Sequence, residues 1–274
     1  MSIGLLESLF LLAAWVITPL ALRLLPDSKP LALARKLQPV AALLATISFF
    51  VAKGPIAAAL ALPWLALNGL VALGGLLGLK AALRGGIPAL LMTAAILFPP
   101  VGGVHLVASR QGYPLAGFPE PIILLTAIHF HFTAFAAPIL ASLAGGRLGK
   151  VAGLGLVGGT PLLAAGFLFS PHLKAAAVGL LVVSVIGIAI AQLAALPRVE
   201  SRPARLLLAL SSLSVIAGMI LAAVYEHGFY TGRSWISIPQ MAWSHGLLNG
   251  LGFSLGGLAA WKIDSCNPKP PASL

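Results

Sequence analysis

The chain has 274 residues, of which 59% are hydrophobic and only 8% are charged, and its mean hydropathy is +1.02. Because a soluble domain carries about 25% charged residues, this composition excludes a water-soluble protein and predicts an integral membrane protein. The net charge of +11 would suggest nucleic acid in a soluble chain, but here the basic residues lie in short segments between apolar runs. There they set topology and contact anionic lipid, so we expect the lipid bilayer, and no nucleic acid, as a partner.

Charges and clusters of proline and glycine divide the chain into apolar runs. We predict nine membrane spans, at residues 3–22, 37–52, 56–79, 87–108, 121–143, 151–169, 174–196, 204–224 and 241–262. The expected fold is an all-α, polytopic transmembrane helix bundle, forming a single transmembrane domain over residues 1–274 in a bacterial inner membrane. A tight turn at 53–55 separates the second span from the third, so a count of eight stays open if 37–79 is one broken unit.

The first apolar run is predicted to remain as a span, because Glu7 precedes its core and Arg23 follows it, the reverse of a cleaved signal peptide. With nine spans and the N-terminus outside, thirteen of the 17 lysines and arginines fall on the inner side, Lys269 among them. The positive-inside rule therefore favours an outer N-terminus and an inner C-terminus. Cys266 is the single cysteine, so no disulfide framework or thiolate metal cage is expected within one chain.

The fifth span carries His129 and His131 well inside an apolar run. Histidine is costly in hydrocarbon unless it is paired or faces a polar cavity, so these residues indicate a functional site. His131 lies about 200° around the helix from His129, which disfavours one metal held by both. Pro138 lacks the amide that would bond the carbonyl of Ala134, so we expect a bend there.

The other candidates lie near the outer ends of the last two spans. His245 and Asn249 share one face of the ninth span, and Glu226 lies near the end of the eighth. With the predicted topology all six histidines lie toward the outer leaflet. We therefore predict a site in the outer half of the bundle, built by the residues His129, His131, His245, Asn249 and Glu226. The alternative is that these side chains only form hydrogen bonds between neighbouring helices.

Two segments carry a resemblance to a known family. Residues 125–138 (LTAIHFHFTAFAAP) and 241–253 (MAWSHGLLNGLGF), with their His-Phe-His and His-Gly-x-x-Asn cores, resemble the YndJ-like family of bacterial membrane proteins. The resemblance implies that the fifth and ninth spans form one site. The family's usual description as a transporter implies little about mechanism.

Three functions follow from these patterns. The leading hypothesis is binding or transport of a small molecule or ion, in which His129 and His245 bind the ligand or relay protons and Asn249 orients His245. The alternative is an intramembrane enzyme acting on a lipophilic substrate, either an acid–base isomerase, cyclase or hydrolase, or an enzyme that uses a metal or haem. The third is a structural or assembly factor. The sequence specifies no cofactor, no substrate and no oligomeric state.

Overall fold

A computed structural model describes residues 3–266, and these residues form nine helical spans and no strand. Spans 1 to 8 are long and apolar enough to cross a membrane. Span 9 runs continuously from Ile238 to Ser265 through four short helical segments. The segments of the nine spans, in chain order, are α1 (Leu5–Leu12), η1 (Ala13–Ile17) and α2 (Thr18–Leu24); α3 (Lys29–Ser48); α4 (Pro55–Arg84); α5 (Gly86–Leu97) and α6 (Pro99–Gln111); α7 (Ile122–His131), η2 (Phe132–Ala136) and α8 (Ala137–Ala144); α9 (Gly146–Phe169); α10 (Pro171–Ala195) and η3 (Leu196–Arg198); α11 (Arg202–Tyr230); and α12 (Ile238–Met241), η4 (Ala242–Gly246), η5 (Leu248–Leu255) and α13 (Gly256–Ser265).

The all-α, nine-helix architecture predicted from the sequence is confirmed for the described residues, and the second and third spans are separate helices. Helix starts are marked by serine caps followed by proline at Ser28, Ser170, Ser201 and Ser237. Span 2 begins at Lys29, eight residues before its predicted start. Its charged first turns are helical because Arg35 folds back onto the carbonyls of Leu22 and Leu25 and pairs with Asp27 at 2.5 Å.

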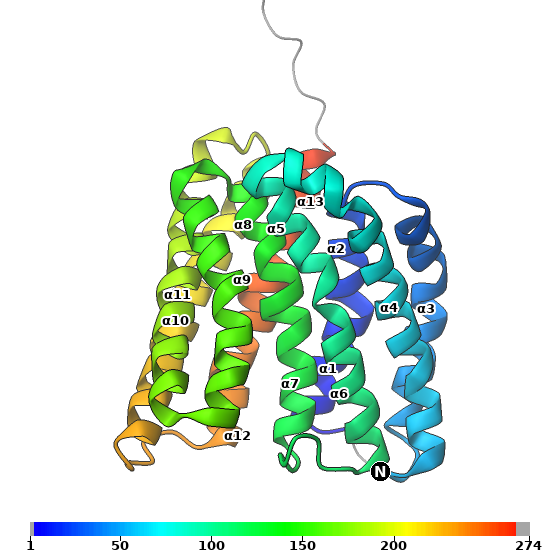
Figure 1. Cartoon of the computed structure of the whole chain (residues 1–274). Helices are drawn as coiled ribbons and strands as arrows, with labels where there is room; N and C mark the ends of the chain where they lie inside the picture. Colours follow the sequence, from blue (N-terminus) through cyan, green and yellow to red (C-terminus); the bar gives the residue numbers. More distant parts are fainter. Residues whose placement is uncertain (1–2, 267–274) are drawn as a thin grey trace, which may run out of the picture.

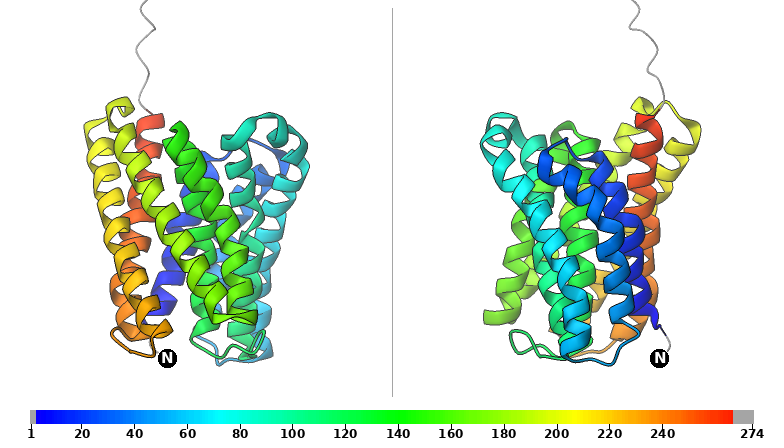
Figure 2. Two further views of the ribbon diagram at one scale, coloured as in Figure 1. Left: turned by 60° about the vertical axis from the view of Figure 1, so that its left-hand side comes forward. Right: turned by 90° about the vertical axis from the view of Figure 1, so that its right-hand side faces the viewer.

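Spans 1, 5 and 9 form the centre of the bundle. They run in the same direction and contact one another, α1 and η1 packing on α7, η2 on η5, and α13 on α2. Spans 2, 3 and 4 pack on one side of this central trio, and spans 6, 7 and 8 pack on the other (Figures 1 and 2). The fold therefore places two groups of three helices around three parallel helices that carry His129, His131 and His245.

The three central spans share an irregular backbone at mid-depth. Each contains π-helical turns, η1, η2 and η4 with η5, and the turns of the three spans contact one another. In spans 1 and 5 the π turn ends directly before a proline: Thr18 donates to the carbonyl of Ala13 before Pro19, and Ala137 donates to Phe132 before Pro138. Proline has no amide to continue the α-helical hydrogen bonds, and in each of these two spans a π turn before the proline accommodates the missing bond. The irregularity predicted near Pro138 is thus present, and span 1 repeats it.

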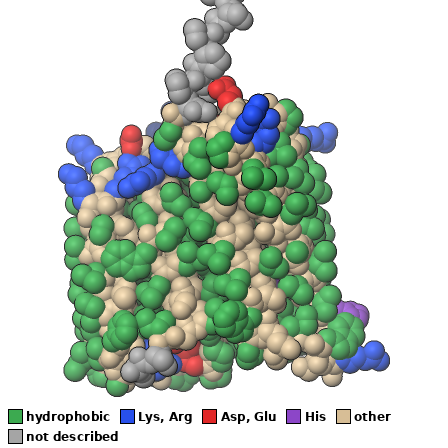
Figure 3. Space-filling model, turned by 180° about the vertical axis from the view of Figure 1, so that it is seen from behind, with side chains coloured by type: hydrophobic (Ala, Val, Ile, Leu, Met, Phe, Trp, Pro, Cys, Tyr) green, Lys and Arg blue, Asp and Glu red, His purple; other side chains and the backbone are tan. Residues whose placement is uncertain are grey.

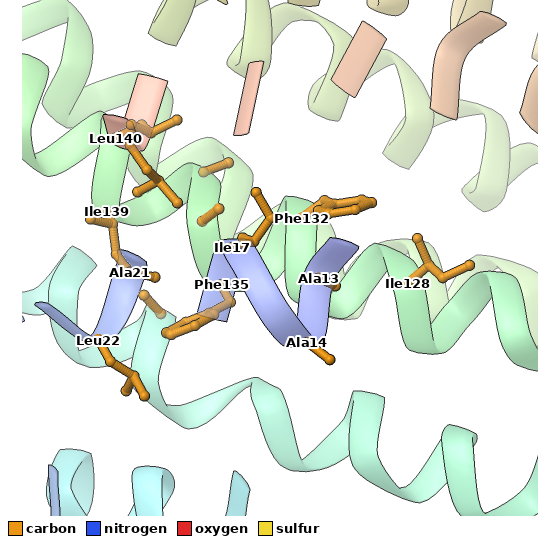
Figure 4. Packing of buried hydrophobic residues seen from close by; sticks show 14 of the residues in the cluster. Ala13, Ala14, Ile17, Ala21, Leu22, Ile128, Phe132, Phe135, Ile139 and Leu140 are labelled. Atoms are coloured by element: carbon orange, nitrogen blue, oxygen red, sulfur yellow. The ribbon is translucent and has the colours of Figure 1, made fainter. Parts of the chain in front are cut away.

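Apolar side chains fill the space between the π turns. Figure 4 shows Ile17 of span 1 beside Phe132 and Phe135 of span 5, all three buried. The largest hydrophobic cluster of the described residues continues from there into every other span of the bundle. The centre of the bundle is consequently packed with apolar side chains.

The two ends of the bundle differ in charge. Of the sixteen described lysines and arginines, twelve lie at the end formed by the turns at 24–29, 84–86, 144–146 and 198–202, which we call the basic end. Four lie at the opposite end, together with the histidines, which we call the histidine end. Figure 3 shows the blue side chains gathered mainly at one end of the face it draws. Lys269, which the sequence analysis also assigned to the inner side, lies outside the described residues.

Candidate paired-histidine site

Spans 5 and 9 bring two imidazoles together in the histidine half of the bundle. The ring of His129, on α7, lies with its centroid 6.2 Å from that of His245, on η4, and the two planes are inclined by 27°. His129 is exposed and His245 is half-buried. The predicted pairing of the fifth and ninth spans is thus visible as a direct contact between their histidines.

The hydrogen bonds of the pair define which nitrogen is free. Nδ1 of His129 lies 2.7 Å from the carbonyl oxygen of Leu125, and Nδ1 of His245 lies 2.8 Å from that of Gly218 on α11. Because a carbonyl only accepts, each Nδ1 must carry the proton, which leaves a lone pair on each Nε2 of the neutral rings. Neither Nε2 has a hydrogen-bond partner among the described residues. The pair therefore presents two free nitrogen acceptors to a proton, a cation or a hydrogen-bond donor.

Asn249 supports this arrangement from one turn further along span 9. Its Nδ2 donates to the backbone carbonyl of His245 at 2.7 Å, so it contacts the backbone of His245 and not its ring. Gly218 faces both residues: a Cβ at this position would lie 2.6 Å from Nδ2 of Asn249. The glycine thus lets span 8 approach closely enough for its carbonyl to hold His245.

His131 lies apart from the pair, as its position on the opposite face of span 5 predicts. It is fully buried, and Trp64 of span 3 donates from Nε1 to its Nε2 across 3.2 Å, while its Nδ1 donates to the carbonyl of Ala127 at 2.8 Å. The ring also packs on Phe10 of span 1, with centroids 5.7 Å apart. Both nitrogens are satisfied, and the contacts of His131 join spans 1, 3 and 5.

Glu226 is also held away from the histidine pair. Its Oε2 lies 3.0 Å from Nζ of Lys174 on α10, and both side chains are buried. The ammonium group lies 3.3 Å from the ring centroid of Phe229. In the topology predicted from the sequence, Lys174 is only one of the four basic residues on the outer side. A buried carboxylate requires a cation nearby. The lone basic residue at the start of the preceding span is the signal that could have identified Lys174 as the partner of Glu226.

Two further groups of polar side chains at the histidine end form contacts of their own. His172 lies 2.7 Å from the hydroxyl of Tyr230, and Glu120 accepts from Ser109 and pairs with Lys53 at 3.2 Å. No group of three histidine, cysteine or carboxylate side chains within residues 3–266 is placed to hold a metal ion. The paired imidazoles differ from these groups in that each ring keeps one nitrogen without a partner among the described residues.

Sequence comparison identifies the family. The model of the YndJ-like protein family matches residues 8–253. The chain belongs to the YndJ-like family. It is also similar to the "Uncharacterized membrane protein YndJ" of Bacillus subtilis (strain 168), at 30% identity over 173 residues, which make up 61% of this chain and 31% of that relative. The chain thus matches about a third of the relative's length, and no solved structure matches it.

Family membership confirms the resemblance inferred from the two histidine segments. Together with the long apolar helices, it establishes an integral, multi-pass protein of the bacterial inner membrane, with the lipid bilayer as its environment. The matched range includes every residue of the paired-histidine site.

Proposed function

We propose that this YndJ-like protein binds and transports a small molecule or ion, using the imidazoles of His129 and His245 as its binding site. The observation that carries the proposal is the pair itself: two rings 6.2 Å apart, each fixed through Nδ1 to a backbone carbonyl and each with a free Nε2. Fixing one imidazole nitrogen sets the ring orientation and leaves the other as a ligand atom, a common arrangement at binding sites.

The chemistry of the pair favours a positively charged ligand or a hydrogen-bond donor. Lone pairs on nitrogen accept protons and bind cations. Two imidazolium ions at this separation would repel each other, so binding of a single proton or a single cation to the pair is preferred over two. The exposure of His129 gives such a ligand access to the pair.

The helix arrangement supports transport. Two groups of three helices lie on either side of a central trio whose backbones are irregular at mid-depth. Transporters commonly place their binding sites near the midplane, beside discontinuous helices, and move one bundle of helices against the other. The π turns of spans 1, 5 and 9 provide irregular backbone adjacent to His129 and His245.

Two polar groups lie between the histidine pair and the basic end, although no charged residue among those described lies at the centre of the bundle. Thr18 and Ser254 lie just past the midpoints of spans 1 and 9, and both are buried. Their hydroxyl groups have no hydrogen-bond partner among the described residues. These hydroxyls are available to coordinate water or a cation that passes between the contacting π turns.

The enzyme alternative is favoured by one observation, that the histidines are confined to one end of the bundle. Catalysis on a lipophilic substrate requires no route through the apolar centre. Under this alternative His129 and His245 would act as acid and base, and the protein would convert a substrate in detergent with no gradient present.

Proton flux in proteoliposomes tests the proposal. Protein is reconstituted into vesicles that contain a pH-sensitive dye, a potassium gradient with valinomycin sets the membrane potential, and the wild type is compared with His129→Ala and His245→Ala. We expect flux above that of empty vesicles and its loss in both variants, whereas His227→Ala, an exposed imidazole at the same end, retains it. Flux equal to that of empty vesicles for protons and for a panel of monovalent and divalent cations would contradict transport of a cation.

A further inference from the structure

A second polar site lies at the opposite end of the molecule from the histidine pair. Where α8 turns into α9, a hollow of about 290 Å³ is bounded by the turn at 144–146, by Leu148, by two alanines of α10 and by the guanidinium-bearing side chains of Arg147 and Arg198. The hollow is at the basic end, near the level at which the spans leave the apolar part of the bundle. It shares no residue with the paired-histidine site.

The two arginines are not neutralised by the protein. No ion pair among the described residues involves Arg147 or Arg198, and both side chains are exposed. Arg198 is nevertheless fixed in place, because its Nη2 donates to the carbonyl of Ala144. A fixed guanidinium with free N–H groups is suited to bind a phosphate group through two parallel hydrogen bonds.

The backbone beside the arginines leaves room for a ligand. Gly145 and Gly146 both have φ of +65°, a conformation that residues with a side chain rarely adopt. A Cβ at Gly145 would lie 3.7 Å from Nη1 of Arg198. Gly145 provides no side-chain cap to α9, so the first amides of α9 add hydrogen-bond donors to those of the two arginines.

The surface that continues from the hollow is apolar. Leu148 and Val151 of α9 are 45% and 60% exposed, and Ile190, one turn before Ala194 on α10, is 47% exposed. A ligand held by the arginines would therefore have its other end against exposed aliphatic side chains at the depth of the bilayer. A phosphate group joined to acyl chains matches both parts of the surface.

From these observations we infer that the hollow bounded by Arg147, Arg198 and the 144–146 turn is a binding site for one anionic glycerophospholipid, with its phosphate on the two guanidinium groups. Basic pockets between helices on the cytoplasmic side of membrane proteins are suited to such headgroups. The positive-inside rule assigns the basic end to that side. The lipid would tie span 5, through its turn into α9, to the end of span 7.

Lipid titration on the purified full chain tests the inference. Protein in a neutral detergent is titrated with phosphatidylglycerol, phosphatidylcholine or inorganic phosphate, and bound lipid is counted by native mass spectrometry while the melting temperature is recorded. We expect one retained phosphatidylglycerol and a rise in melting temperature with this lipid alone. The double variant Arg147→Gln/Arg198→Gln should bind phosphatidylglycerol roughly thirtyfold more weakly, at about fivefold for each arginine.

Two further variants test whether lipid binding depends on the hollow itself. One controls for the general positive charge of the basic end, and the other removes the hollow while keeping both arginines. Lys80→Gln/Arg84→Gln removes the same charge from the same end of the bundle, away from the hollow, and should keep the bound lipid. Ala194→Trp keeps both arginines and fills the hollow, and should lose the lipid. Equal binding of phosphatidylcholine, an equal effect of inorganic phosphate, or unchanged phosphatidylglycerol binding in both the arginine double variant and Ala194→Trp would overturn the inference.

Discussion

Trp64 donates a hydrogen bond from its indole nitrogen to Nε2 of His131, and this contact joins span 3 to span 5 in the apolar core. A tryptophan N–H can only donate, and the carbonyl of Ala127 on the other side of the ring can only accept. His131 is therefore held as the neutral tautomer with its proton on Nδ1. Of the two histidines of span 5, this one has both ring nitrogens bonded within the protein, whereas His129 has Nε2 free.

Removing the indole donor should destabilise the protein without affecting ligand binding. Trp64→Phe leaves Nε2 of His131 buried without a donor, which should lower the free energy of unfolding by about 1–2 kcal/mol. His131→Ala also leaves a cavity and should cost about 3 kcal/mol. Thermal unfolding in detergent measures both effects.

Proton flux per folded molecule distinguishes packing from function at His131. We expect both variants to keep the wild-type flux once it is normalised to the folded fraction. A loss of flux in His131→Ala at unchanged stability would show that this histidine belongs to the transport site.

The buried ion pair at the histidine end gives a second stability prediction. Glu226→Ala leaves the Lys174 ammonium buried without its carboxylate and should destabilise the protein by about 3–5 kcal/mol. The double variant Lys174→Met/Glu226→Leu removes both charges at similar volume and should recover most of this loss, as measured by thermal unfolding. If Glu226→Ala unfolded like the wild type but abolished flux, Glu226 would have a role in the mechanism that its contacts do not indicate.

Gly218 is the point at which span 8 positions both His245 and Asn249. Gly218→Ala introduces a Cβ 2.6 Å from Nδ2 of Asn249, so the Asn249 amide must move and its hydrogen bond to the backbone carbonyl of His245 must break. We expect flux to fall at least tenfold, with moderate destabilisation. Gly179→Ala is the matched control, because nothing lies within 4 Å of a Cβ at that exposed helical position. Equal flux in the two variants would argue against a positioning role for Gly218.

The native cysteine offers a direct test of the predicted topology. Cys266 is exposed and directly follows α13 at the basic end, which the positive-inside rule places in the cytoplasm. A membrane-impermeant maleimide added to intact cells should leave Cys266 unlabelled and should label it after the membrane is opened. In a Cys266→Ser background, Arg233→Cys should be labelled in intact cells. The opposite pattern would invert the assignment of the two ends.

The fold could largely be predicted from the sequence because the pattern of apolar runs is strong. Apolar runs of span length, separated by proline, glycine and charge, predicted nine helices, and nine are present in residues 3–266. The boundaries differ where a charged segment is helical, as at the start of span 2, because tertiary contacts of Arg35 decide its structure. The arrangement of two flanking groups around spans 1, 5 and 9 could not be predicted, since periodicity does not specify which helices meet.

The candidate site was predicted in part. Helical geometry separated His129 from His131, and the structure gives these two residues different neighbours. Glu226 was grouped with the histidines because it lies at the same end, whereas the structure pairs it with Lys174, a contact between distant segments. Gly218 was not identified at all, because its contribution is a backbone carbonyl and the absence of a side chain.

The π turns beside the prolines have a consequence for insertions and deletions. A π turn accommodates one residue more than an α turn, so deleting one residue within 132–136 would restore a regular helix through this part of span 5. Because the turn absorbs its extra residue, the segments on either side of it would then keep their relative orientation, whereas deleting one residue from the regular helix of α7 after His129 would rotate this histidine by about 100° relative to the remainder of the span. The π turn of span 5 is therefore a place where the chain length can change by one residue while His129 still faces His245.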